Sequence, residues 1–117
     1  MAKLYAQVVG VVLLILGIVG FFVNTLLGVP TTTTHSLVHL ISGAWGAYAG
    51  FASGLGGPKA FAQIFGIIYT VVAVVGFLSA GFLANLGIPT NATYNIIHLI
   101  VGLWGLYAGF TGGRGTS

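Results

Sequence analysis

The amino-acid sequence predicts an all-α polytopic membrane protein, with four transmembrane helices arranged as two parallel-repeat helical hairpins. Three observations support this fold class. Of the 117 residues, only three are Lys or Arg, none is Asp or Glu, and 57% are hydrophobic, whereas an average soluble domain is about 25% charged. Four apolar stretches each approach the roughly 20 residues that a helix needs to cross a bilayer. The second half of the chain also copies the first.

The first predicted span covers residues 4–23, which carry no charged side chain. The second covers residues 33–51 and is the most polar of the four, because His35, Ser36 and His39 lie in its first half. None of the four stretches alternates polar and apolar residues in the way that membrane β-strands do, so all four are predicted to be helices.

The third predicted span covers residues 60–83, and the fourth covers residues 91–110. Threonine-rich segments follow Pro30 and Pro89, directly before the second and fourth spans. A proline favours an extended residue before it, and threonine hydroxyls cap helix N-termini, so both segments are predicted to start a helix.

The three positive charges predict the orientation of the chain. With four spans, Lys3, Lys59 and Arg114 all fall on one side of the membrane. The positive-inside rule places that side, and with it both termini, in the cytoplasm. A net charge of +3 in so apolar a chain indicates topology, and no nucleic-acid partner is expected. Residues 112–117 are predicted to form a short flexible tail.

An internal duplication divides the chain into a first two-helix repeat, residues 1–58, and a second, residues 59–117. Residues 39–51 align with residues 98–110, with 10 of 13 positions identical. The second copy gains three residues around residues 79–85. Because each copy holds two spans, both copies enter the membrane from the same side, which makes the repeat parallel. Equivalent residues are therefore expected at equal depth.

The second and fourth spans carry the same stripe of one histidine and several glycines. At about 100° per residue the stripe residues share one helix face, within roughly 60° of one another. One interpretation is close helix packing, because small residues let helices approach in lipid. In that case each histidine hydrogen-bonds a neighbouring helix. The candidate cofactor-binding residues are His39, Gly43 and Gly46 in the first copy and His98, Gly102 and Gly105 in the second.

The second interpretation is a ligand site beside the two histidines. Since the chain has no acidic side chain, His39 and His98 are expected to be neutral, which is the state a metal ligand requires. A neutral imidazole above a glycine groove suits a flat ring, so both histidines are candidate axial ligands to the metal of a chlorophyll or a haem. A carotenoid is a further candidate, and the binding of a quinone or a lipid, or a role in transport, is a third interpretation of the two histidines. His35, by contrast, is expected to be a solvated residue at the helix start.

Aromatic residues near the predicted cytoplasmic ends of the spans are expected to form an interfacial belt. Its predicted members are Tyr5, Tyr48, Phe51, Phe61, Tyr107 and Phe110.

The composition argues against catalysis. Without Asp, Glu or Cys there is no carboxylate acid or base, no carboxylate-oriented triad and no thiolate nucleophile or zinc ligand. The protein is therefore expected not to be an enzyme. It predicts a small non-catalytic subunit that packs in the lipid bilayer among other transmembrane subunits of a larger photosynthetic or respiratory complex. The alternative is a small homo-oligomeric transporter or channel, although few polar residues could line its path.

The segment Asn95-Ile-Ile-His98-Leu99, which follows Leu86-Gly-Ile-Pro89, resembles the bacterial integral membrane family known as domain of unknown function 4383. The resemblance covers nearly the whole chain. It implies a four-span, internally duplicated protein with an Asn-x-x-His-Leu motif opening the second and fourth spans, in a bacterial inner or photosynthetic membrane. In the first copy Ser36 stands where the motif has Asn, and Tyr94 replaces an acidic residue often found before Asn95. The family implies a fold and no function.

Overall fold

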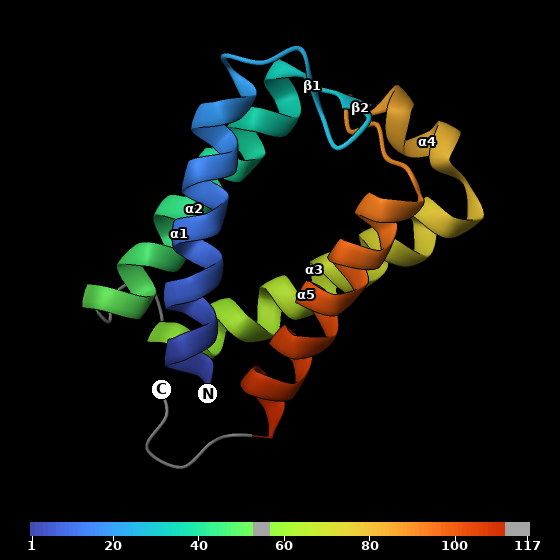
Figure 1. Cartoon of the computed structure of the whole chain (residues 1–117). Helices are drawn as coiled ribbons and strands as arrows, with labels where there is room; N and C mark the ends of the chain where they lie inside the picture. Colours follow the sequence, from blue (N-terminus) through green and yellow to red (C-terminus); the bar gives the residue numbers. More distant parts are fainter. Residues whose placement is uncertain (53–56, 112–117) are drawn as a thin grey trace.

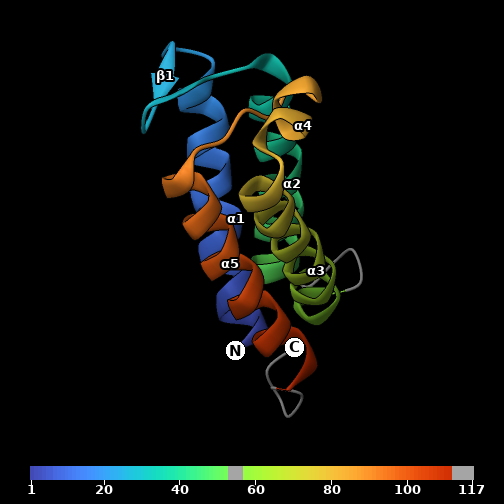
Figure 2. The same ribbon diagram turned by 90° about the vertical axis from the view of Figure 1, so that its right-hand side faces the viewer.

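The computed structural model describes residues 1–52 and 57–111, so Arg114 and the predicted tail lie outside the described residues. Four long helices form two antiparallel pairs (Figure 1): α1 (Ala2–Gly20) packs along α2 (Thr33–Ala52), and α3 (Gly57–Leu78) packs along α5 (Ala92–Phe110). Both α1 and α3 start at the end of the molecule where the chain begins (Figure 1), so the two pairs have the same polarity. The short elements lie at the opposite end (Figure 2).

Three of the helices in the described part of the chain, α1, α3 and α5, are long and apolar enough to cross a membrane. The sequence predicts four. The remaining long helix, α2, has sufficient length with 20 residues, but its first two turns contain Thr33, Thr34, His35, Ser36 and His39. These polar residues lower its hydropathy below that of the other three helices.

The third predicted span is shorter than expected. Residues 60–83 were predicted as one continuous helix, whereas α3 ends at Leu78 and a separate helix, α4, covers Ala80–Asn85. The residue between them, Ser79, has a non-helical backbone conformation (φ −155°, ψ 75°), which no α-helix can contain. The break lies in the segment where the second repeat is three residues longer than the first, so the added length goes into the turn and α4 and does not lengthen α3.

Glycines bring the two helices of each pair into close contact. A Cβ atom built on Gly10 of α1 would lie 2.6 Å from the carbonyl carbon of Gly46 in α2, and one on Gly66 of α3 would lie 2.7 Å from that of Gly105 in α5. Any side chain at these positions would force the backbones apart. Both helix pairs therefore depend on backbone-to-backbone packing, as expected for helices associating in lipid.

The same side-chain hydrogen bond also joins the helices of each pair. Gln7 donates from Nε2 to the carbonyl oxygen of Gly50 at 3.0 Å, and Gln63 donates in the same way to Gly109 at 2.8 Å. Each bond satisfies a polar side chain inside an apolar helix pair, where an unpaired amide would be costly.

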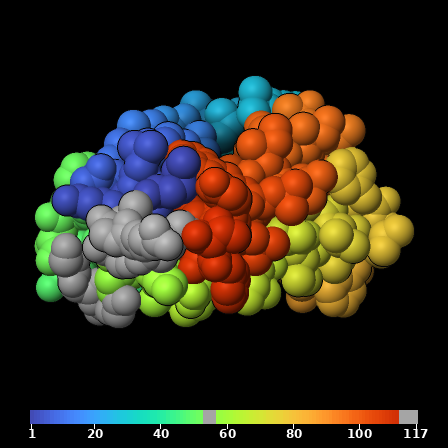
Figure 3. All heavy atoms as spheres, turned by 90° about the horizontal axis from the view of Figure 1, so that it is seen from below, coloured from blue at the N-terminus to red at the C-terminus, as the bar shows by residue number. Residues whose placement is uncertain are grey.

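An aromatic core joins the two pairs at the end of the molecule where α1 and α3 begin. Phe61 of α3 stacks on Phe65 at 4.4 Å between ring centroids and meets the rings of Tyr5 and Trp45 at 5.9 Å and 5.2 Å. The Tyr5 hydroxyl donates to the carbonyl oxygen of Val101 at 3.0 Å. At this end the start of α1 lies beside the end of α5 (Figure 3), where the Trp104 indole nitrogen donates to the sulfur of Met1 at 3.1 Å.

This core corrects part of the predicted aromatic belt. Tyr5 and Phe61 were expected at the membrane interface, but both are 0% exposed. They lie where the two helix pairs converge, so each ring contacts the opposite pair instead of lipid. The predicted belt residues near the ends of α2 and α5 are exposed, as expected: Tyr48, Phe51, Tyr107 and Phe110.

The opposite end contains the only departure from helix among the described elements, a small antiparallel hairpin of β1 (Thr25–Leu26) and β2 (Val29–Pro30). Its turn residues both have positive φ, 53° at Leu27 and 81° at Gly28, as a tight type I′ turn requires. This hairpin reaches the second helix pair, because the hydroxyl of Tyr94 in α5 donates to the carbonyl oxygen of Leu26 at 2.7 Å.

Two further hydrogen bonds join the pairs at this end. Asn91 donates from Nδ2 to the carbonyl oxygen of Leu27 at 3.0 Å, and the Thr32 hydroxyl donates to that of Gly87 at 2.6 Å. The two helix pairs thus touch at both ends of the molecule and enclose a cavity between these contacts.

Candidate functional site

Capping residues position the three histidines at the starts of α2 and α5. The Thr32 hydroxyl accepts a hydrogen bond from the backbone N–H of His35 at 3.0 Å, and His39 follows one turn later on the same face of α2. In α5 the side chain of Asn91 accepts from the backbone N–H of Tyr94 at 2.9 Å. His98 follows one turn after Tyr94, so the histidines of both helices face the space between the pairs.

The rings of three histidines and two tyrosines, which come from α2, α3 and α5, form one cluster. His35 lies 4.3 Å from His39 and 6.4 Å from His98 between ring centroids. Tyr69 of α3 and Tyr94 lie 5.4 Å and 6.0 Å from His98. The sequence prediction for His35 was therefore wrong: its side chain is 7% exposed and bridges the two pairs. The contact between Tyr94 and the β-hairpin covers it.

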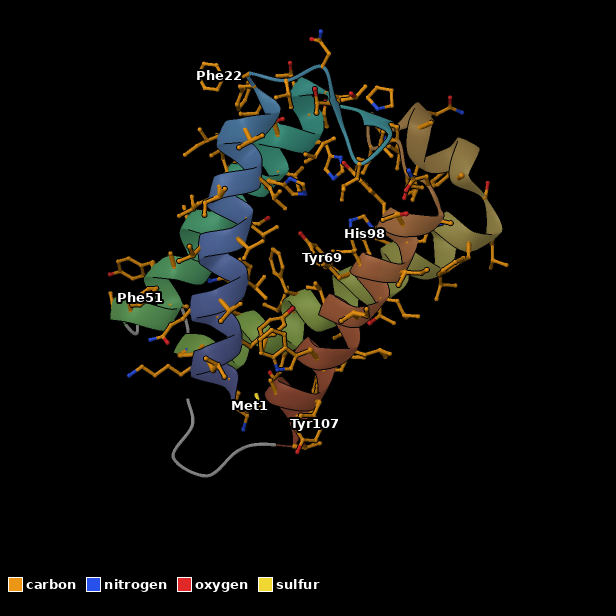
Figure 4. All side chains as sticks on the ribbon, viewed as in Figure 1. Met1, Phe22, Phe51, Tyr69, His98 and Tyr107 are labelled. Carbon is orange, nitrogen blue, oxygen red and sulfur yellow. The ribbon has the colours of Figure 1, made fainter. Side chains whose placement is uncertain are left out.

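A cavity of about 180 Å³ lies between the two helix pairs. Its walls are almost entirely apolar and come mainly from α1 and α5, while His39, Tyr69, Tyr94 and His98 supply its polar atoms. Tyr69 and His98 point into the space between the pairs (Figure 4). The two candidate histidines from the sequence therefore line one cavity, together with two tyrosines.

The candidate glycines do not line this cavity. Gly43 contacts the backbone of α1, where an added Cβ would lie 2.5 Å from the nitrogen of Leu14. An added Cβ on Gly46 would meet Phe61, and on Gly105 it would meet Tyr5. Gly102 contacts Thr70. The groove predicted for a flat ring is thus filled by neighbouring helices, since the stripe faces the partner helix.

Two buried side-chain atoms have no hydrogen-bond partner within the described residues: Nδ1 of His98, a residue that lines the cavity, and Oγ1 of Thr70, which packs against Gly102. In addition, no hydrogen bond among the described residues involves the Tyr69 hydroxyl, which lines the cavity. Buried polar groups are normally paired, so unpaired groups at a cavity indicate either stored strain or a missing ligand. Across residues 1–52 and 57–111, no three metal-ligating side chains are arranged to hold an ion.

Sequence reasoning did not identify Tyr69 and Tyr94 as site residues. The repeat contained a signal for Tyr94, because it occupies the position of His35 in the second copy and both rings face the cluster. Tyr69 corresponds to Leu13 in the first copy, and both side chains line the cavity. The available signal in both cases was a pair of equivalent positions at which the two copies carry different residues.

The chain belongs to the family described as Domain of unknown function (DUF4383), which matches residues 3–111. The family identity expected from the Asn95-x-x-His98 motif is therefore confirmed. No curated protein and no solved structure shows a significant match to the chain.

Proposed function

We propose that this chain is a non-catalytic integral membrane protein whose four long helices all cross the bilayer, with both termini in the cytoplasm. The placement of the polar residues of α2 supports the fourth span. His35 and Ser36 are 7% and 3% exposed and face the protein, whereas Leu37 and Ile41 on the outward face are 45% and 70% exposed. Such a helix offers lipid an apolar surface despite its low mean hydropathy.

We further propose that the protein acts as a packing subunit within a larger membrane complex. The observation that carries this proposal is a stripe of exposed apolar residues that occurs twice, once on α2 and once on α5. Equivalent positions are exposed to similar extents, 70% and 61% at Ile41 and Ile100, and 52% and 60% at Tyr48 and Tyr107. The duplication thus gives the chain two similar apolar faces, on which two similar neighbouring helices can pack.

The polar side chains of the described helices support a non-catalytic role. Gln7, Gln63 and Tyr5 donate hydrogen bonds to backbone carbonyl oxygens of neighbouring helices, and Asn95 accepts one from the Thr90 hydroxyl at 2.8 Å. These groups hold the fold together and are not arranged around a reacting atom. The same bonds weigh against the transporter alternative, because both glutamines are directed at backbone rather than at a polar path.

By analogy with assemblies that contain small hydrophobic subunits, we propose that this larger complex is respiratory or photosynthetic. Tetrapyrrole ligation at His39 or His98 is not part of the proposal, because pockets that enclose even drug-sized ligands hold about 300 Å³ or more and this cavity holds about 180 Å³. A chlorophyll or haem would require the helix pairs to separate. A carotenoid or other pigment on an outer face stays a prediction.

Photo-crosslinking tests the packing role. A benzophenone amino acid at Ile41 or Ile100 is expected to give discrete crosslinks to the same partner protein in native membranes, and gentle detergent extraction should yield that partner in fixed ratio to this chain. The matched control is the same amino acid at Phe65, an aromatic position that is 4% exposed and should crosslink only within the chain. Crosslinks to lipid alone, together with extraction as a free monomer, would contradict the proposal.

A further inference from the structure

The cavity between the helix pairs has the size of a single ring. A dry cavity of about 150 Å³ lined by Leu, Ile and Phe can bind benzene, and the present cavity of about 180 Å³ has similar walls, including Val9, Leu13 and Val101. Water can be held only beside the few polar side chains, because it needs two to four polar partners and the rest of the wall offers none. An apolar ring is therefore the molecule that this volume and lining suit best.

The polar atoms at the cavity specify the chemistry of that ring. Tyr69 and His98 are each 7% exposed and lie 5.4 Å apart between ring centroids. Both side chains line the cavity, and within the described residues neither the Tyr69 hydroxyl nor the His98 imidazole takes part in a hydrogen bond. A hydroxyl and a neutral imidazole can each donate a hydrogen bond. Both side chains can therefore stabilise one acceptor, such as a carbonyl oxygen.

The charge distribution favours a neutral ligand. The chain contains no acidic side chain that could pair with a cation. Lys3 and Lys59 both lie in the first turns of α1 and α3, at the end with the aromatic core, and neither lines the cavity. An unpaired carboxylate or ammonium in this apolar space would be costly, which disfavours a fatty acid and favours an uncharged carbonyl compound.

The cavity opens toward the surface between α1 and α5. Val8, Val12 and Ile97 line it and are at the same time 41%, 46% and 40% exposed. Val8 and Val12 lie on the middle turns of α1 and Ile97 lies on the second turn of α5, and both helices are apolar enough to cross a membrane. The opening is therefore at the depth of the hydrocarbon, where an alkyl tail attached to the ring can extend into lipid.

We propose that the cavity binds a neutral, tailed, single-ring carbonyl compound of the quinone class, with its ring among Leu13, Val101 and Trp104. Tyr69 and His98 donate hydrogen bonds to its carbonyl oxygen, and its tail passes between α1 and α5. The proposal concerns binding alone and involves no redox step. It goes beyond the packing role, which is tested at outer positions that do not line the cavity, so either proposal can fail while the other stands.

Trp104 provides the readout, because it lines the cavity and quinones quench indole fluorescence. In a Trp45→Phe variant, a short-chain benzoquinone is expected to quench Trp104 saturably. In the complementary Trp104→Phe variant, quenching should rise only linearly with the quinone partitioned into the micelle. Circular dichroism establishes that each variant keeps the helix content of the parent chain. Linear quenching in both variants would overturn the proposal.

Side-chain substitutions then locate the site. Tyr69→Phe keeps the ring and removes one donor, so binding should weaken by about 3- to 10-fold, as expected for one hydrogen bond. The matched control is Tyr107→Phe, at a hydroxyl on the outer face that is 60% exposed, and it should leave the affinity unchanged. Leu13→Phe fills part of the cavity and should weaken binding by at least about 10-fold.

Competition identifies the chemical class. An alkylbenzene of equal size, which lacks a carbonyl oxygen, should compete at least about 5-fold more weakly than the quinone if the two donors contribute. Equal competition would contradict the carbonyl assignment and indicate a site for any apolar chain. Saturable quenching that neither Tyr69→Phe nor Leu13→Phe weakens would place the quinone outside the cavity and overturn the proposal.

Discussion

The substitution Gly10→Val is expected to separate α1 from α2 and to lower the free energy of unfolding by at least about 3 kcal/mol. A Cβ at this position would meet the backbone nitrogen of Ala47 and lie 2.6 Å from the carbonyl carbon of Gly46. Backbone atoms cannot move aside as a flexible side chain can, so the helices must part and lose contacts along their whole length. Overpacking usually costs about 1–3 kcal/mol when side chains can adjust, and here they cannot.

The measurement is the midpoint of unfolding as the SDS fraction of mixed micelles rises, followed by circular dichroism. Gly66→Val, at the equivalent position of the second pair, should cause a loss of similar size, because its Cβ would meet Leu106 and Gly105 in the same way. Gly81→Val is the control, since nothing lies within 4 Å of its Cβ position. A Gly10→Val midpoint equal to that of Gly81→Val would show that the helices do not pack through these glycines.

The second large effect is expected for Phe61→Ala, which should loosen the contact between the two helix pairs at a cost of about 3 kcal/mol. Phe61 is 0% exposed and joins α3 to both helices of the first pair, through Tyr5 at 5.9 Å and Trp45 at 5.2 Å between ring centroids. Removing a buried phenyl ring leaves a cavity and deletes its dispersion contacts, which typically costs about 3–5 kcal/mol in soluble proteins.

Unfolding in mixed micelles again provides the measurement, and the tryptophan emission locates the change, because Trp45 packs directly on Phe61. Phe77→Ala is the control on the same helix, at a ring that is 54% exposed and should contribute little. Equal losses in the free energy of unfolding from Phe61→Ala and Phe77→Ala would contradict this expectation, because Phe61 would then not be the central contact between the pairs.

The long apolar stretches and the duplication of the sequence were sufficient to predict the four long helices, although not the exact residues at which they end. Charge-free runs of about 20 residues indicate the long helices, of which three are apolar enough to cross a membrane. The repeat predicts which helices are equivalent, because glycines such as Gly10 and Gly66 occupy matching positions in the two copies. The break at Ser79 could not be placed, since residues 79–85 remain apolar across the turn. Hydropathy reports how apolar a segment is and not where its backbone bends.

The candidate site was predicted only in part. His39 and His98 line one cavity, but the glycines beside them face the partner helix. A stripe of small residues indicates a close approach without identifying what approaches. His35 was misplaced because its burial depends on Tyr94 and on the β-hairpin. These contacts are long-range, and a single sequence carries no local signal for them.

The side of the membrane on which α2 ends is the sharpest test of the proposed four-span arrangement. Two parallel hairpins require α2 to cross the bilayer. The chain has no cysteine, so the exposed residues Thr25, before α2, and Ala52, at its end, can each be changed to cysteine without altering the charge. A membrane-impermeant maleimide should label Thr25→Cys in intact cells and Ala52→Cys only after permeabilisation. Labelling of both cysteines from the same side would contradict the four-span account.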